Sequence, residues 1–339
     1  MSEKLIGIGV VGAGYWGPNI IRNFSSIDSC RLISVCDLDS EKLKKVKEKY
    51  PAIEATNSFD ELLKKKEINA IAIASFPSTH YELSKKALLA GKHVFCEKPL
   101  TLNHAESEEL AKIAIEKNLT LMVGHTYVYS PAVIKLKQLI DSKKLGKIFY
   151  IYIRRLNLGL FQKDTNVLWD LAPHDISIVL FLLNSKPVSV SAMGYSHIIK
   201  NVEDVAFINI KFENGIFCNI HDSWLDPCKV RETVVVGSKQ MAVFDDTEPL
   251  KKIKVFERSV DKHDSYESFG EFQLSYNYGD IHIPKIASNE PLKLELEHFI
   301  ECINSKKIPL SNGSFASNVV RIIEAAQKSI KNNGLEVKF

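Results

Sequence analysis

A lysine, an aspartate and a histidine in this chain have the types and the spacing that could serve proton transfer. Lys98 stands in a Glu-Lys-Pro triplet directly after a short apolar run, and Asp170 lies four residues before His174. If Pro173 lies in the first turn of a helix, Asp170 and His174 project on the same side of it. A carboxylate can then orient an imidazole that titrates near neutral pH, and a lysine ammonium can stabilise negative charge. On these residues alone, a helix-start acid, a buried histidine and a chance triplet remain alternatives.

A glycine-rich turn near the start has the spacing of a dinucleotide-binding loop. The turn is Gly12-Ala13-Gly14-Tyr15-Trp16-Gly17, it follows an apolar strand, and Asp37 comes 20 residues after its last glycine. The first glycine permits the tight turn, the second lets backbone approach a pyrophosphate, and the third allows close packing of a helix. Asp37 would accept hydrogen bonds from a ribose and repel a 2′-phosphate, which favours NAD over NADP. The alternatives are a turn without a ligand and, for Asp37, a helix cap.

The elements that must position these residues alternate in the first half of the chain. Short apolar runs alternate with amphipathic segments along the chain, which is typical of a parallel sheet covered by helices on both faces. The expected strands span residues 5–11, 32–36, 70–74, 93–95 and 120–123, and the expected helices span 18–24, 40–49, 59–65, 80–90 and 103–117. We therefore predict an α/β, doubly wound Rossmann domain over residues 1–126 that binds NAD at its strand ends.

The second half has a different pattern, in which longer strands with alternating apolar residues dominate. The expected strands span residues 148–156, 188–196, 205–212, 216–223, 231–236, 240–245 and 251–257, and helices are expected at 292–305 and 314–332. A turn at Asn214-Gly215 is a hairpin signal. The pattern predicts an α+β domain over residues 127–339 with a large, mostly antiparallel sheet, one face of which is open.

Composition excludes several classes of protein. The 339 residues carry 44 basic and 41 acidic side chains, a formal charge of +3, which is too balanced for a binder of nucleic acid. The six cysteines form no CxxC pair, so we expect reduced thiols and neither disulfides nor a metal site. The first residues lack the pattern of a signal peptide, and no apolar run approaches about 18 residues. We expect a cytoplasmic protein without a nucleic-acid or membrane partner.

Taken together, these motifs resemble the Gfo/Idh/MocA oxidoreductase family, and the resemblance covers nearly the whole chain. It is carried by the glycine turn, Asp37, and the three segments Cys96-Glu97-Lys98-Pro99-Leu100, Val123-Gly124-His125-Thr126-Tyr127 and Trp169-Asp170-Leu171-Ala172-Pro173-His174-Asp175. The resemblance implies that Lys98 is the catalytic lysine, which positions and polarises the alcohol oxygen. It implies His174 as general acid and base and Asp170 as the residue that orients the substrate. Whether Lys98 or His174 carries the proton stays open.

The resemblance also implies residues near the cofactor. The loop Ser75-Phe76-Pro77-Ser78-Thr79-His80 is expected to touch the ribose on the nicotinamide side, although His80 could merely begin a helix. His125 is expected near the nicotinamide or the substrate, with a structural turn histidine as the alternative. Besides the six-residue glycine turn and Asp37, the expected cofactor contacts are therefore Ser75, Phe76, Pro77, His80, Glu97, Lys98 and His125.

The substrate implied by the resemblance is a secondary alcohol or ketone of a sugar. The chain looks most like members that act on nucleotide-activated sugars in surface-polysaccharide pathways. A free sugar or inositol dehydrogenase, an NAD-dependent glycosidase and a non-catalytic NAD-binding sensor are the alternatives. One of Arg154 and Arg155 could meet a substrate anion, or both could be solvated strand residues. The segment 274–284, with Tyr276 and Tyr278, could be a sugar-facing loop or a plain edge strand.

The open face of the second sheet also predicts contact with another protein chain. An exposed sheet face of this size usually contacts another chain, and in the family that the sequence resembles it forms subunit contacts. We therefore expect a homo-dimer or homo-tetramer held through the C-terminal sheet.

Overall fold

The chain folds into two compact units. A computed structural model describes residues 5–161, 165–262 and 274–339. One unit, here called the Rossmann unit, comprises Met1–Tyr129 and Asn289–Arg321, and the other, the sheet unit, comprises Ser130–Ser288 and Ile322–Phe339. The predicted division at residues 126 and 127 therefore lies three residues before the observed one. Residues 289–321, which the prediction assigned to the second domain, pack with the first.

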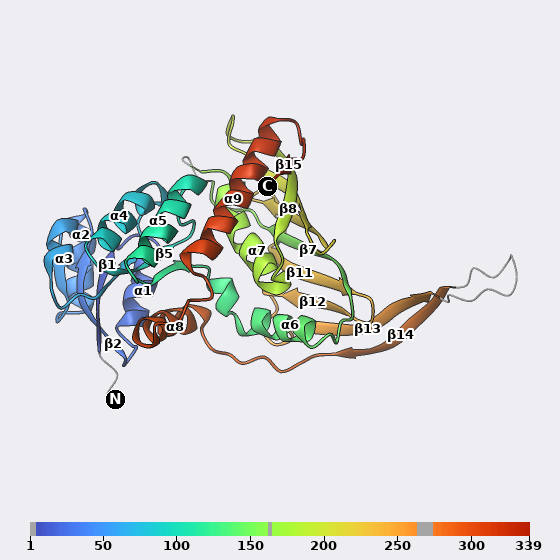
Figure 1. The fold of residues 1–339 in the computed structure, drawn as a ribbon, viewed down its shortest axis with the longest axis horizontal. Coiled ribbons are helices and arrows are strands. Elements are labelled where there is room, and N and C mark those ends of the chain that lie inside the picture. The colour runs from blue at the N-terminus through green and yellow to red at the C-terminus, as the bar shows by residue number, and fades with distance from the viewer. Residues whose placement is uncertain (1–4, 162–164, 263–273) are drawn as a thin grey trace, which may run out of the picture. The chain divides into compact units, whose positions relative to one another are not determined.

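The Rossmann unit is built on a parallel sheet with the strand order β3-β2-β1-β4-β5-β6 (Figure 1). Its strands are β1 Ile6–Val11, β2 Cys30–Cys36, β3 Glu54–Thr56, β4 Ala70–Ile73, β5 His93–Glu97 and β6 Leu121–Gly124. Strand β1 is buried along its whole length, because helices cover both faces of a doubly wound sheet. Chain order reverses between β1 and β4, so the loops that follow these strands border the point where such sheets bind ligands. The prediction missed only β3, which is three residues long and mostly exposed.

Helices of the Rossmann unit come from both ends of the chain. The first five are α1 Gly17–Phe24, α2 Ser40–Lys49, α3 Phe59–Lys64, α4 Pro77–Leu89 and α5 His104–Glu116, and η1 Thr126–Tyr129 is a turn of 3₁₀ helix. Helix α8 (Pro291–Ser305) contacts α1 and η1. Phe299 of α8 packs edge-on against Phe95 of β5, with ring centroids 5.8 Å apart. A helix close to the C-terminus thus completes the core beside β5.

The sheet unit contains nine strands in the order β14-β13-β12-β11-β7-β10-β9-β8-β15 (Figure 1). The strands are β7 Ile148–Leu156, β8 Pro187–Tyr195, β9 Val205–Phe212, β10 Phe217–Ser223, β11 Val230–Gly237, β12 Met241–Asp245, β13 Ile253–Lys262, β14 Leu274–His282 and β15 Val337–Lys338. Only the β7–β10 pair among these described strands is parallel, which confirms the predicted mostly antiparallel sheet. The segment 274–284 is therefore mostly an edge strand rather than a loop.

Two helices of the sheet unit, α6 (Pro131–Asp141) and α7 (Val167–Leu183), pack against its strands, and α9 (Gly313–Lys331) ends in this unit. Helix α7 begins at Val167, six residues before Pro173, because the Asn166 side chain caps it by accepting a hydrogen bond from the Trp169 N–H at 3.1 Å. Pro173 therefore lies inside the helix, and the expectation that it lies in the first turn is wrong. Asp170 and His174 still share a side of α7, since the helix continues through both residues.

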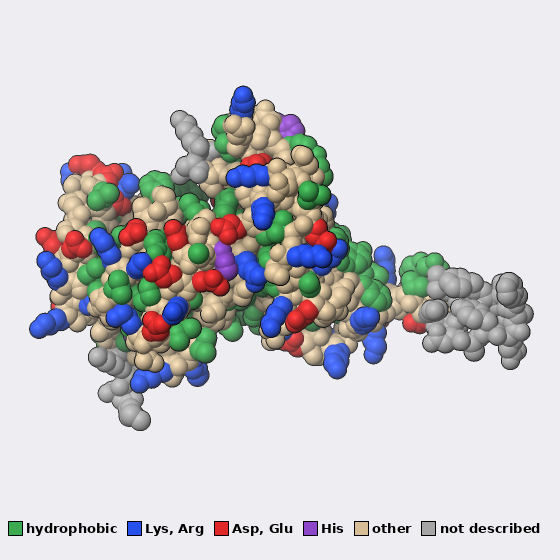
Figure 2. All heavy atoms as spheres, turned by 45° about the horizontal axis from the view of Figure 1, so that its top comes forward, with side chains coloured by type: hydrophobic (Ala, Val, Ile, Leu, Met, Phe, Trp, Pro, Cys, Tyr) green, Lys and Arg blue, Asp and Glu red, His purple; other side chains and the backbone are tan. Residues whose placement is uncertain are grey.

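Two observations concern nucleic acid and membranes, which the sequence does not predict as partners. On the face drawn in Figure 2, Lys and Arg side chains are interspersed with Asp and Glu side chains rather than gathered into a patch. Within the described ranges, no helix combines the length and the hydropathy needed to cross a lipid bilayer.

Candidate active site

The glycine turn between β1 and α1 leaves open space where a pyrophosphate would lie. Gly12 has a φ of +96°, and a side chain there would come within 2.5 Å of the Ala74 carbonyl oxygen. A Cβ on Gly17 would collide with the Gly12 carbonyl oxygen, so both positions require glycine. A Cβ on Gly14, in contrast, would meet nothing within 4 Å. The turn is thus closed towards the protein and open at its middle glycine, which fits the diphosphate of NAD at the start of α1.

Asp37, at the end of β2, is held beside this turn. Its Oδ2 accepts a hydrogen bond from the Ala13 N–H at 2.6 Å, and its Oδ1 accepts one from the Asp39 N–H at 2.9 Å. The cap of α2 is Asp39, whose carboxylate accepts from the Glu41 N–H at 3.0 Å. The helix-cap alternative for Asp37 is therefore wrong, and its carboxylate is hydrogen-bonded to the backbone of the glycine turn. Tyr15, in the same turn, is almost fully exposed.

The loop after β4 is tied to the segment that follows β5. His80, in the first turn of α4, is buried, and its Nδ1 lies 2.7 Å from the Pro99 carbonyl oxygen while its Nε2 lies 3.1 Å from the Ser75 carbonyl oxygen. Burial, aided by the nearby charge of Lys98, lowers the pKa of His80, although both carbonyls oppose that shift. Both ring nitrogens thus face the backbone, and His80 connects the two loops. Phe76 and Pro77 stand at the start of α4, where Phe76 is largely exposed.

Beneath Lys98 lies a group of buried polar side chains at the ends of β5 and β6. Glu97 is 9% exposed, and burial raises its pKa to about 7 against the opposing effects of Lys98 and the Trp16 indole N–H. His125 is 1% exposed and packs edge-on against Phe315, with centroids 5.7 Å apart. Burial, with a contribution from the charge of Lys98, lowers the pKa of His125 to about 3. Neither of its ring nitrogens has a hydrogen-bond partner among the residues described. The predicted Glu97, Lys98 and His125 therefore lie together in the Rossmann unit.

Glu295 of α8 belongs to the same group and was not predicted. It is fully buried, and its Oε2 accepts a hydrogen bond from the Thr126 hydroxyl at 2.7 Å. Burial first, and the charge of Glu97 second, raise its pKa well above the ordinary value. A signal was present in the sequence, since Glu295 shares the apolar stripe of its helix with Leu292 and Phe299 at spacings of three and four.

In the sheet unit, the Asp170 carboxylate on α7 is held by Trp224, the residue directly after β10. The Trp224 indole N–H donates to Asp170 Oδ2 at 3.0 Å, and Trp224 is itself 1% exposed. Phe161 packs edge-on against Trp224, with centroids 5.6 Å apart. His174, one turn further along α7, is half-buried. Trp224 was missed because 54 residues separate it from its partner.

The two arginines of β7 have different roles. Arg155 is buried and makes a bidentate ion pair with Asp175 of α7, through Nε at 2.8 Å and Nη2 at 2.6 Å. Asp222 of β10, the register partner of Arg155, is also fully buried, and burial raises its pKa well above the ordinary value. Arg154 is half-exposed and pairs with Glu232 at 2.6 Å. The solvated-pair alternative is therefore wrong for Arg155, whose side chain lies in the interior of the sheet unit.

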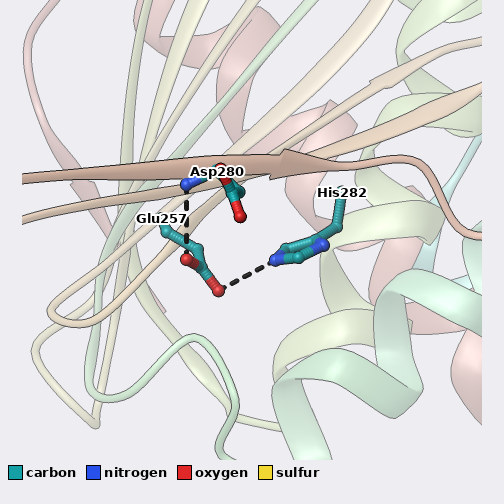
Figure 3. Close-up of side chains that lie close together, drawn as sticks. All are labelled: Glu257, Asp280 and His282. Atoms are coloured by element: carbon teal, nitrogen blue, oxygen red, sulfur yellow. Dashed lines mark hydrogen bonds and ion pairs between the residues drawn. The ribbon is translucent and has the colours of Figure 1, made fainter.

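A second polar cluster lies on the exposed ribbon of β13 and β14. Glu257, Asp280 and His282 bring one potential metal ligand each within 4.8 Å of the others (Figure 3). Glu257 already accepts from the His282 ring at 2.9 Å and from the Asp280 N–H at 3.3 Å. These contacts account for the arrangement as a surface ion pair.

Two family models match the chain. One, described as an oxidoreductase family with an NAD-binding Rossmann fold, GFO_IDH_MocA, matches residues 6–125. The other, described as the GFO/IDH/MocA C-terminal domain, matches residues 133–243. The matched ranges include the glycine turn, Asp37, Lys98, Asp170 and His174.

Relatives in two substrate classes align over most of the chain. The UDP-N-acetylglucosamine 3-dehydrogenase of Acidithiobacillus ferrooxidans is 27% identical over 318 residues, which is 90% of this chain and 91% of that protein. The myo-inositol 2-dehydrogenase of Thermotoga maritima is 24% identical over 334 residues, 96% of each chain.

Solved structures confirm the fold. That of the UDP-N-acetylglucosamine 3-dehydrogenase GnnA from Acidithiobacillus ferrooxidans superposes with a TM-score of 0.80 at 24% identity, over 97% of this chain and 98% of that one. GenD2 from gentamicin A biosynthesis, solved in complex with NAD, superposes with a TM-score of 0.82 at 18% identity, over 99% and 97%.

Proposed function

Because the chain belongs to the Gfo/Idh/MocA family of oxidoreductases, we propose that it transfers a hydride between NAD and a secondary alcohol of a nucleotide-activated sugar. The family and its NAD-binding domain establish a dehydrogenase that acts on CH–OH groups of sugar-type substrates. The observation that carries the finer proposal is the 27% identity to a UDP-N-acetylglucosamine 3-dehydrogenase over 90% of the chain. A free inositol is the second candidate, favoured by the 24% identity to an inositol dehydrogenase over 96% of the chain.

The proposal assigns the three predicted residues to separate tasks. In the oxidation, His174 accepts the hydroxyl proton as the O–H bond breaks, and the C–H electron pair leaves with its hydrogen as a hydride. NAD, when bound, supplies the hydride acceptor. The Lys98 ammonium stabilises the negative charge that develops on the alcohol oxygen. Asp170, held by the Trp224 indole at 3.0 Å, orients the substrate.

The cofactor contacts are proposed from the geometry of the Rossmann unit. The backbone from Gly12 to Gly17 would hold the diphosphate, with Gly14 giving it room, and Asp37 would accept hydrogen bonds from the adenosine ribose. Ser75, Phe76, Pro77 and the loop that His80 supports would border the ribose on the nicotinamide side. His125 and Glu97 lie beside Lys98 and would complete the nicotinamide end.

The test is the turnover of a His174→Asn variant across a panel of UDP-, GDP- and dTDP-sugars, free sugars and inositols. Asparagine keeps a polar side chain but cannot take up the proton, so kcat should fall about 10²- to 10⁴-fold while the Kd for NAD stays unchanged. His282→Asn, at an exposed histidine of the sheet unit, is the matched control and should keep full activity. A His174→Asn enzyme with near-normal kcat would overturn the assignment.

The panel also discriminates between the substrate classes. NADH accumulation with a nucleotide sugar supports the proposal, whereas a response to inositol or a free sugar alone contradicts it. An NAD-dependent glycosidase would cleave its substrate without net NADH, and a sensor would bind NAD without any turnover. The proposed setting is surface-polysaccharide synthesis in the cytoplasm, where the free thiols of the six cysteines would persist.

We further propose that the open face of the sheet unit pairs with a second copy of the chain. Alternate strand residues face opposite sides, and Arg155 bonds to α7, so Tyr150 on β7 faces away from that helix. Tyr150 and its register partner Phe217 are about 40% exposed, and Met193 and its partner Phe207 are exposed on the same face. Light scattering should give a dimer or tetramer that Phe207→Asp with Phe217→Asp dissociates. A monomeric wild type would refute this pairing.

A further inference from the structure

We propose that Glu97 and Glu295 form a carboxyl pair that carries one proton at mildly alkaline pH and so leaves a single negative charge beside Lys98. Glu295 is then a positioning residue, which acts on the site through Glu97. The inference rests on the proposed role of Lys98 as the cation that stabilises the alcohol oxygen.

Glu97 reaches this place because of the pairing between β5 and β6. It stands opposite Gly124 in the register of the two strands, and a Cβ at position 124 would come within 3.0 Å of the Glu97 carboxylate. Glycine at 124 therefore leaves the room that this side chain occupies. Its carboxylate accepts hydrogen bonds from the Trp16 indole and, at 3.3 Å, from the Lys98 N–H. Its Oε1 has no partner within the part of the chain that the structure describes.

Glu295 approaches the same place from α8. Its Oε2 accepts from Thr126, which lies two residues after Gly124, so the two carboxyl groups contact residues on either side of His125. Its Oε1 is buried and, like that of Glu97, lacks a partner among the described residues. Both ring nitrogens of His125 are also buried without a described hydrogen-bond partner. Glu97, Glu295 and His125 therefore bring four unpartnered polar atoms into one region. A proton on one carboxyl turns one of these acceptors into a donor for the others.

Charge balance decides how many protons the pair carries. Lys98, which follows β5, acts on Glu97, and the turn before α1 contributes the neutral Trp16. Tyr129 of η1 is affected by the charge of Glu295, which together with burial raises the pKa of that phenol. His125, which follows β6, is the other titratable group at this place. His125 is uncharged at neutral pH, so Lys98 provides the positive charge. Two buried carboxylates would place a second negative charge in a site that water does not reach, which like-charge repulsion and burial both oppose. One proton removes that excess.

The hydrogen bonds indicate which carboxyl keeps the proton. Glu97 accepts from the Trp16 indole and the Lys98 N–H, both of which favour its charged form. Glu295, in contrast, accepts from the Thr126 hydroxyl at one oxygen and has no described partner at the other. Both pKa values are raised, that of Glu97 to about 7 and that of Glu295 well above its ordinary value. A carboxyl with a raised pKa stays protonated as pH rises until its own value is passed. Below about pH 7 the pair is therefore neutral, and above it Glu97 is charged while Glu295 keeps its proton. Lys98 then faces one negative charge throughout the range in which the pair carries one proton.

The experiment is a pH titration of the whole protein by infrared spectroscopy, in which a protonated carboxyl gives a C=O band distinct from carboxylate bands. With glutamate labelled by ¹³C, wild type should retain one shifted C=O band at pH 8.5. Glu295→Gln should abolish that band, whereas Glu97→Gln should keep it and move its disappearance to lower pH, because the charge of Glu97 no longer raises the pKa of Glu295. Glu297→Gln, on the same helix but exposed, should leave the titration as in wild type.

Two further measurements keep the inference testable if Glu295→Gln folds poorly. Thr126→Val removes the hydroxyl that favours the charged form of Glu295, and the band should then persist to higher pH than in wild type. In turnover, the ionisation of Glu97 should contribute to the rise of kcat/KM near pH 7 in wild type and Glu295→Gln, and Glu97→Gln should make that rise less steep. Absence of the band from wild type at pH 8.5, or its survival in Glu295→Gln, would overturn the pair. Because the spectra need no substrate, these outcomes are independent of whether the proposed reaction is correct.

Discussion

Replacing Arg155 by methionine should be among the most damaging single changes in the sheet unit. The substitution keeps an unbranched, largely apolar side chain but removes the cation that binds both oxygens of Asp175 at 2.6 and 2.8 Å. Asp175 and Asp222 are 0% exposed, so water cannot compensate the lost charge. Removing one partner of a buried ion pair costs about 3–5 kcal/mol. At roughly 2–4 °C per kcal/mol for a unit of this size, Tm should fall by roughly 6–20 °C.

The assay is urea unfolding followed by circular dichroism at pH 8 and at pH 5. The deficit should shrink at pH 5, because burial raises the pKa of Asp222 and loss of the Arg155 charge raises it further, so that a proton can neutralise this carboxyl. Arg154→Met is the matched control, since Arg154 is the adjacent residue of β7, is half-exposed and has Glu232 as its partner. Arg154→Met should lower the free energy of unfolding by about 0–1 kcal/mol. Equal losses for the two variants would refute the view that Arg155 neutralises the buried acids.

Two shorter predictions concern the cofactor turn and the Asp170 carboxylate. Gly12→Ala should lower the free energy of unfolding by at least about 1–2 kcal/mol, because its φ is +96° and Ala74 is in the way, whereas Gly14→Ala should leave stability intact and weaken NAD binding in calorimetry. Equal stability of the two variants would contradict this. Trp224→Phe should lower kcat about tenfold with unchanged NAD affinity, since Asp170 loses the indole that holds it, and an unchanged kcat would show that the bond at 3.0 Å does not matter for turnover.

Most elements of the fold could be predicted because their signals are local. Strand β1 is an apolar run that ends in a glycine turn, and the helices α2 and α5 begin at Asp39 and Asn103, whose side chains cap them. Such patterns need no knowledge of distant residues. Strand β3 was missed because it lies at the sheet edge, where three residues without an apolar run suffice to pair with β2.

The candidate site was predictable only in part, since its supporting residues are remote in sequence. Lys98 and His125 stand in motifs next to strand ends, but Glu295 meets Thr126 across 169 residues. The position of Pro173 was misjudged because prolines favour the first turn, whereas the Asn166 cap places the helix start further upstream. The ion pair of Arg155 could not be foreseen, because only the pairing of β7 with β10 and α7 decides which of two adjacent arginines points inward.

The return of residues 289–321 to the Rossmann unit has a consequence for the order in which the protein is made. Phe95 and Thr126 are synthesised long before Phe299 and Glu295, their partners on α8. Between residue 129 and residue 321 the ribosome adds 192 residues, which at about 5–20 residues per second takes roughly 10–40 s. During that interval the nascent NAD-binding unit lacks the helix that covers one part of its interior. The core of this unit, and with it the set of residues around Lys98, is therefore complete only when translation is almost over.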